Sequence, residues 1–137
     1  MNSTGFTTQR QIIGEYYEKR IHPSIEKVIN QKIIKSPLST SKYDVYSDDY
    51  NIEIKTRNIK STDYNEWMCV STKFINSGKK IILFYYFIGD DKLFYIEYDI
   101  KKFSTYKLRY IYANNQYLIP SKDFIEVYNH NVILLNE

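Results

Sequence analysis

Three side chains with the chemistry to hydrolyse a phosphodiester bond lie in the segment KYDVYSDDYNIEIKTR, residues 42–57. The segment alternates like a β-hairpin, and a turn at residues 48–49 places Asp44 directly across from Glu53. Opposed carboxylates repel each other, but a divalent cation between them makes the arrangement favourable, and carboxylate oxygens suit Mg²⁺ or Mn²⁺. A metal-bound water has a lowered pKa and is a competent nucleophile, and Lys55 beside it could orient it or help to deprotonate it.

The same register divides the hairpin into an apolar and a polar face. The apolar face, which we expect to lie against the core, carries Tyr43, Val45, Ile52 and Ile54. The polar face carries Asp44, Glu53 and Lys55, and we expect it to be open. A plain surface ion pair between Lys55 and Glu53 is the alternative interpretation. It would leave the repulsion at Asp44 uncompensated, because Lys55 is offset by one step along its strand.

The elements before the hairpin are predicted to be helical. Apolar residues recur at helical spacing from about Thr8, with a threonine as a plausible cap. Pro23 either ends this helix or begins a second one that runs to about Ile33, because proline suits a first turn and not a helix interior.

The elements after the hairpin are predicted to be a helix and a second hairpin. Residues 62–77 are interpreted as the helix, with Asp63 in a capping pattern and Gly78 as a natural stop. The run at 81–88 is apolar on both faces, which is typical of a central strand covered above and below. It enters a hairpin that turns at residues 89–92.

Smaller elements are predicted in the C-terminal part. Asp99 caps a short helical piece over 100–108, and a third hairpin turns at residues 114–115. Another short helix is predicted over 121–128. The order of elements indicates an α/β (α+β) fold.

Length and composition limit the class of protein. The 137 residues suit a single domain, 1–137, with its core at roughly 8–99 and accessory elements at 100–137. The one cysteine and two histidines argue against a disulfide or a Cys/His metal site. The net charge of +3 permits an anionic partner without requiring one. Because no apolar leader or run of roughly 20 apolar residues is present, we expect no membrane association and a soluble intracellular protein, cytoplasmic or nuclear, of cellular, viral or phage origin.

Asp44, followed on the adjoining strand by Glu53 and Lys55, resembles the D…(D/E)-x-K signature of the PD-(D/E)xK nuclease superfamily. That superfamily includes type II restriction endonucleases, archaeal Holliday-junction resolvases and many phage and viral recombination nucleases. The resemblance covers roughly residues 8–90. It implies a restriction-endonuclease-like αβββαβ core, in which a central mixed sheet is flanked by helices and the aspartate and the E-x-K lie on neighbouring strands.

The resemblance implies further site residues. Many members add a metal-binding glutamate from the N-terminal helix, and Glu15 is the candidate here because it lies beside the apolar stripe; an ordinary exposed helix residue is the alternative. Related enzymes often place a basic or amide residue on the helix after the E-x-K strand, where Lys73 stands, with a solvated lysine as the alternative. Thr56 and Arg57 could reach a phosphate, Arg57 through a bidentate guanidinium, or could simply end an exposed strand.

Taken together, the resemblance implies a Mg²⁺- or Mn²⁺-dependent deoxyribonuclease, and an endonuclease rather than an exonuclease. Asp44, Glu53 and Lys55 would be catalytic, and Asp44, Glu53 and Glu15 would bind the metal. The DNA substrate would be a junction or another structured form, with a small restriction-type enzyme as the other possibility. Compact members of the superfamily often act as homodimers, so a homodimer is expected here. The alternatives are a non-catalytic nucleic-acid-binding or viral accessory protein that keeps the fold, and an unrelated interaction module.

Overall fold

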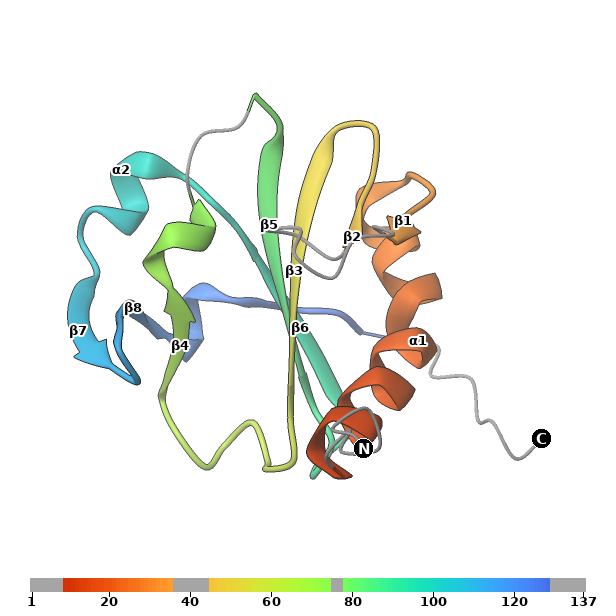
Figure 1. The fold of residues 1–137 in the computed structure, drawn as a ribbon, viewed down its shortest axis with the longest axis horizontal. Helices are drawn as coiled ribbons and strands as arrows, with labels where there is room; N and C mark the ends of the chain where they lie inside the picture. Colours follow the sequence, from red (N-terminus) through yellow and green to blue (C-terminus); the bar gives the residue numbers. More distant parts are fainter. Residues whose placement is uncertain (1–8, 36–44, 75–77, 129–137) are drawn as a thin grey trace, which may run out of the picture.

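The computed structural model of the chain describes residues 9–35, 45–74 and 78–128, with only the backbone described over 9–15. The described elements form three layers (Figure 1). Helix α1 (Gln9–Ile29) covers one face of a six-stranded sheet, and a three-stranded sheet covers the other face. The fold is therefore α+β with a mixed central sheet, as predicted. Among the described residues, the layer opposite α1 is a small sheet with short helical turns and not the long helix that was expected there.

The six-stranded sheet has the order β1-β2-β3-β5-β6-β9. Its strands are β1 (Ile34–Lys35), β2 (Val45–Tyr46), β3 (Tyr50–Arg57), β5 (Lys80–Phe87), β6 (Lys92–Glu97) and β9 (Ile125–Glu126). Strands β3 and β5 are parallel, and the other neighbours are antiparallel. Parallel neighbours need a crossover connection. Here the chain leaves β3, runs through residues 66–74 on the other side of the sheet from α1, and returns as β5.

The three-stranded sheet forms the far layer. It has the order β4-β8-β7, all antiparallel, and consists of β4 (Glu66–Val70), β7 (Lys107–Ile111) and β8 (Asn114–Pro120). Three short helices connect the strands: the 3₁₀ helix η2 (Ser71–Phe74), α2 (Ile100–Phe103) and the 3₁₀ helix η3 (Ser121–Asp123). None of the described helices is long and apolar enough to cross a membrane.

Helix α1 runs without interruption through Pro23, so the predicted break at that residue is wrong. An interior proline costs about 3 kcal/mol. Ile21, Ile25 and Ile29 lie one turn apart on the covered face and are at most 7% exposed. Burying each of them contributes about 1.5–3 kcal/mol, so the stripe outweighs the proline.

Strand β5 separates two hydrophobic clusters. Ile82, Phe84 and Tyr86 face α1, whereas Leu83, Tyr85 and Phe87 face the small sheet. Every residue from 81 to 87 is buried. The prediction of a central strand covered on both faces is confirmed, as is a hairpin from β5 to β6, in which residue 87 pairs with residue 92.

The register predicted for the hairpin at 42–57 is confirmed where the structure describes it. Val45 pairs with Ile52, and Tyr46 pairs with Asn51. Val45 and Ile52 are both 1% exposed and pack in the cluster beneath α1, with Ile54 against it. Tyr43 and Asp44 lie outside the described residues.

The helix predicted over residues 62–77 is wrong, because the chain there forms strand β4 and then η2. Trp67 and Cys69 are buried while their neighbours are not, which is the period of two of a half-covered strand. Asp63 does not cap a helix but accepts the N–H of Lys60 at 2.9 Å within the preceding turn. Tryptophan, cysteine and valine also favour a strand over a helix.

The smaller C-terminal predictions are corrected in position or in length. The third hairpin turns at Tyr112 and Ala113, two residues before the predicted turn, and both have positive φ (54° and 63°). The helix predicted over 121–128 is reduced to η3, which is followed by β9. Asp99 caps α2 as predicted, by accepting the N–H groups of Lys101 and Lys102, although this helix ends at Phe103.

Candidate functional site

The carboxylate of Glu53 lies at the centre of a group of charged side chains, which we call the Glu53 cluster: Glu53, Lys55 and Lys73. Lys55 Nζ lies 3.2 Å from Glu53 Oε2, and Lys73 Nζ lies 3.9 Å from Glu53 Oε1. The Glu53 side chain is 11% exposed. A carboxylate this buried needs charged or hydrogen-bonding partners, and the two lysines supply them.

The polar face of β3 was expected to be open, and that expectation is wrong. One face of β3 carries every second residue from Glu53 to Arg57. These residues pair in register with Leu83, Tyr85 and Phe87 of β5. These β5 residues belong to the cluster between the two sheets. The small sheet therefore covers this face, and the Glu53 cluster lies at the boundary between the two layers.

Helix η2 brings Lys73 to the Glu53 cluster. The adjacent Phe74 is 4% exposed, and its ring centroid lies 4.9 Å from that of Phe103 and 5.4 Å from that of Tyr98. This anchor fixes η2 between the sheets and leaves Lys73 on the side of Glu53. The expected basic residue is thus present beside Glu53, although it comes from a 3₁₀ helix.

The other predicted site residues have different outcomes. Arg57 continues the row of side chains that begins with Glu53 and Lys55, and its guanidinium carbon lies 5.7 Å from the ring centroid of Tyr85. Thr56 points to the opposite face of β3, because side chains alternate along a strand, so the structure does not bring it to the cluster. Asp44 lies outside the described residues, as does the side chain of Glu15, whose backbone belongs to α1.

The described donor atoms fit a divalent cation only in part. The carboxylate of Glu53 is the kind of hard oxygen ligand that Mg²⁺ and Mn²⁺ prefer. Among the side chains that the structure describes, no three His, Cys, Asp or Glu residues lie together as a metal site. The remaining predicted ligands, Asp44 and Glu15, are those whose side chains are not described. Within the described set, the cluster combines one carboxylate with two amines.

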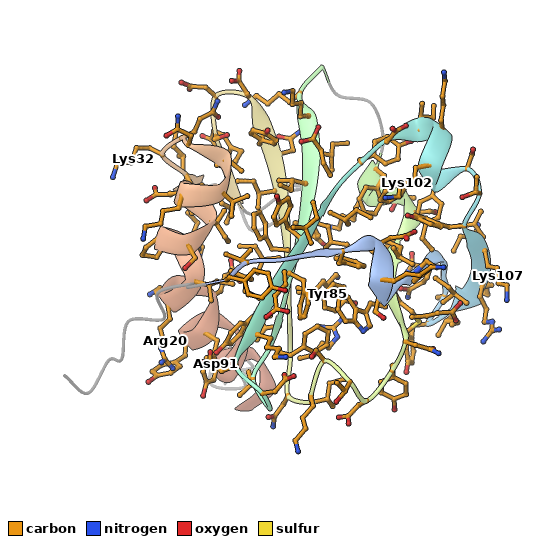
Figure 2. All side chains as sticks on the ribbon, turned by 180° about the vertical axis from the view of Figure 1, so that it is seen from behind. Arg20, Lys32, Tyr85, Asp91, Lys102 and Lys107 are labelled. Carbon is orange, nitrogen blue, oxygen red and sulfur yellow. The ribbon has the colours of Figure 1, made fainter. Side chains whose placement is uncertain are left out.

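The charges of the Glu53 cluster affect the pKa of the buried Cys69 thiol. The pKa of its thiol is raised to about 12, chiefly by burial and also by the nearby Glu53 carboxylate, whereas Lys55, Lys73 and Arg57 act to lower it. Tyr85, which is labelled in Figure 2, is 3% exposed, and burial raises its pKa to about 12. The Tyr85 hydroxyl donates to the carbonyl oxygen of Met68, which ties β5 to β4.

A cleft that the sequence did not predict opens where the row of side chains on β3 ends. It has a volume of about 470 Å³ and lies between the end of β3 and the small sheet. Arg57, Tyr64, Glu66, Trp67, Tyr85 and Arg109 are among the residues that line it. These residues come from four different elements and a loop, so no local motif could have brought them together. The low helix propensity of Trp67, Cys69 and Val70 was the available signal that this segment forms a strand.

The loop between β3 and β4, which carries Tyr64, is held in place by several contacts. Ser61 donates its backbone N–H and its hydroxyl to the Asp90 carboxylate, and the indole N–H of Trp67 donates to the Tyr64 carbonyl at 3.2 Å. Gly89 donates to the carbonyl of Ile59 at 3.0 Å. A Cβ at Gly89 would lie 2.7–2.9 Å from the loop backbone, so only glycine permits this approach.

Comparisons of the chain with protein-family profiles, with curated proteins and with solved structures found no match.

Proposed function

We propose that this protein is a metal-dependent nuclease that hydrolyses phosphodiester bonds in DNA, as an endonuclease. The observation that carries the proposal is the largely buried Glu53 carboxylate on β3, with Lys55 two residues further along the same face and Lys73 of η2 beside it. It is supported by the order of elements before it, since α1, β1 and β2 precede β3 and β2 pairs with β3 in the predicted register.

The proposal gives each charged group a role. Glu53 would hold Mg²⁺ or Mn²⁺ together with Asp44 and Glu15. A cation bound there would stabilise the negative charge that develops on the phosphate during hydrolysis. Lys55, fixed by its ion pair with Glu53, would hold a proton at its Nζ atom and orient the attacking water toward the phosphorus. Lys73 and Arg57 would bind the phosphates of the substrate strand.

A cleavage assay tests the proposal directly. Linear duplex, closed circular, single-stranded and four-way-junction DNA are incubated with Mg²⁺, Mn²⁺ or EDTA. We expect cleavage with a divalent cation and none in EDTA, and cutting of the closed circle would establish endonucleolytic attack. Asp44→Ala, Glu53→Gln and Lys55→Ala should each lower the rate by roughly 100-fold or more, the typical effect of removing one catalytic group.

Two substitutions outside the cluster serve as matched controls. Glu97→Gln neutralises a carboxylate on β6, and Lys107→Ala removes an amine from β7. Both positions are exposed, so both variants should cut at the wild-type rate. Metal-dependent cleavage that persists at full rate in Asp44→Ala and Lys55→Ala would refute the proposed site.

A second candidate function is nucleic-acid binding without cleavage. It is favoured by the described charges of the cluster, in which two lysines face a single carboxylate, a balance that suits phosphate binding. DNA binding by the wild-type protein, weakened by Lys55→Ala but accompanied by no cleavage of any substrate and no calorimetric binding of Mg²⁺ or Mn²⁺, would establish this function instead.

A further inference from the structure

The cleft beside Arg57 has the size and lining of a site for a single planar group. Its volume of about 470 Å³ falls within the roughly 300–1,000 Å³ of small-ligand sites. Two arginines, Arg57 and Arg109, line it together with one carboxylate, Glu66, so the charges favour an anionic ligand. The aromatic side chains of Tyr64, Trp67, Tyr85 and Phe87 contribute to the same lining.

The cleft lies on the same face of β3 as the Glu53 cluster, at the end of the strand. Glu53, Lys55 and Arg57 succeed one another on one face of β3, and Arg57 also lines the cleft. Four residues of strand span about 13 Å, which is about four nucleotide rises along a B-form strand and fewer along an extended one. A strand whose phosphates contact Lys55 and Lys73 would therefore place a nucleotide near the cleft a few positions away.

The planar groups at the cleft are arranged for stacking. Tyr64 is 66% exposed, so its ring is accessible to a ligand. The guanidinium carbon of Arg57 lies 5.7 Å from the ring centroid of Tyr85, so a second planar group lines the cleft beside an aromatic ring. Bases without a partner stack on tyrosine rings and on guanidinium planes, whereas bases within a duplex cannot reach them. The contacts that fix the Tyr64 loop leave little ordering cost for binding.

We propose that the cleft binds one unpaired nucleobase of the substrate strand, next to the phosphate held by Arg57. The proposal rests on the proposed nuclease function and specifies its substrate class: DNA with a single-stranded or splayed segment near the cut, in preference to continuous duplex. Tyr64 would stack on the base. Arg109 would stack on the base or bind the phosphate beside it.

Binding measured in EDTA tests the cleft without requiring cleavage. Fluorescence anisotropy is recorded with a labelled oligothymidine and with a labelled blunt hairpin duplex of equal phosphate count. We expect wild type to bind the single strand more tightly. Tyr64→Ala and Arg109→Ala should each weaken oligothymidine binding by about tenfold and should change duplex binding by less than about twofold. Tyr64→Phe, which keeps the ring, should bind like wild type.

Two substitutions provide controls of the same chemistry. Tyr112→Ala removes a tyrosine that is 80% exposed, and Lys107→Ala removes a cation two residues from Arg109 on the same strand. Neither residue lines the cleft, so both variants should bind oligothymidine like wild type. Circular dichroism verifies that each variant is folded.

The outcomes separate the two proposals. If oligothymidine binding is equally strong in Tyr64→Ala, Arg109→Ala and the controls, the cleft does not bind a base, whatever the cleavage assay shows. If both substitutions weaken single-strand binding selectively but no DNA is cut, the cleft proposal stands as a binding site and the nuclease proposal fails. Equal loss of duplex and single-strand binding would indicate a general phosphate contact and would also overturn the base site.

Discussion

Replacing Cys69 by alanine should change how the stability of the protein responds to alkaline pH. The Cys69 thiol is 1% exposed, and burial is the main cause of the rise in its pKa from 9.0 to about 12. Between these values the folded protein keeps the thiol proton, whereas the unfolded chain releases it. The unfolded state then binds fewer protons than the folded state, so the free energy of unfolding falls as the pH rises.

The size of the effect follows from the two pKa values. The thiol contributes a slope of about −1.4 kcal/mol per pH unit from pH 9 upward, reaching about 4 kcal/mol at the folded pKa of about 12. Cys69→Ala removes one heavy atom from the core, which costs about 1 kcal/mol at neutral pH. The variant should therefore be less stable than wild type at pH 8, equal to it near about pH 10, and more stable above that.

Urea unfolding of both proteins at several pH values between 8 and 11, in EDTA and a reducing agent, measures this crossing. The two proteins share every other ionisable group, so the difference between the two free energies of unfolding isolates the effect of replacing Cys69. A difference that stays constant from pH 8 to pH 11 would show that the folded protein does not retain the thiol proton. In Glu53→Gln, the three cations near the thiol lose their opposing carboxylate, and its pKa should fall.

Three further substitutions, the last with a matched control, test the fold. Gly89→Ala places a Cβ 2.7–2.9 Å from the loop backbone, and urea unfolding should show a loss of about 1–3 kcal/mol; an unchanged midpoint would contradict the close approach. Ala113→Gly should raise the free energy of unfolding by about 0.5–1 kcal/mol, because glycine tolerates the positive φ of 63° in this turn; a lower melting temperature would refute this. Ile25→Ala should cost about 2–5 kcal/mol because Ile25 is fully buried, whereas Ile34→Ala, at a residue 46% exposed, should cost at most about 0.5 kcal/mol.

Local pattern was sufficient for those elements in which one face is apolar and a turn is short. The alternation around Val45 and Ile52 fixed the register of β2 and β3, because a slip of one residue would have moved both side chains out of the core. Asp99 was identified as a helix cap from its position alone. The ion pair between Lys55 and Glu53 also follows from their spacing on one strand. The sequence favoured a divalent-cation site there, with this ion pair as the alternative.

Features that depend on distant contacts could not be predicted in the same way. The strand at 66–70 has its partner in β8, some 50 residues away along the chain, and the strand preference of its residues was outweighed by an apparent cap and stop for a helix. The turn at Tyr112 and Ala113 lacks the residues that such turns prefer, because the pairing of β7 with β8 sets its position. The burial of Glu53 follows from the covering sheet and has no signature in its own segment.

The central strands act as a partition between two halves of the protein. The residues of β5 that face α1 and those that face the small sheet belong to different hydrophobic clusters, which share only a backbone. Substitutions in clusters that share no side-chain contacts have nearly additive effects on stability. The layer beneath α1 can therefore change during evolution, or be redesigned for thermal stability. Such changes leave the charged residues of β3 and the cleft on the opposite side as they are.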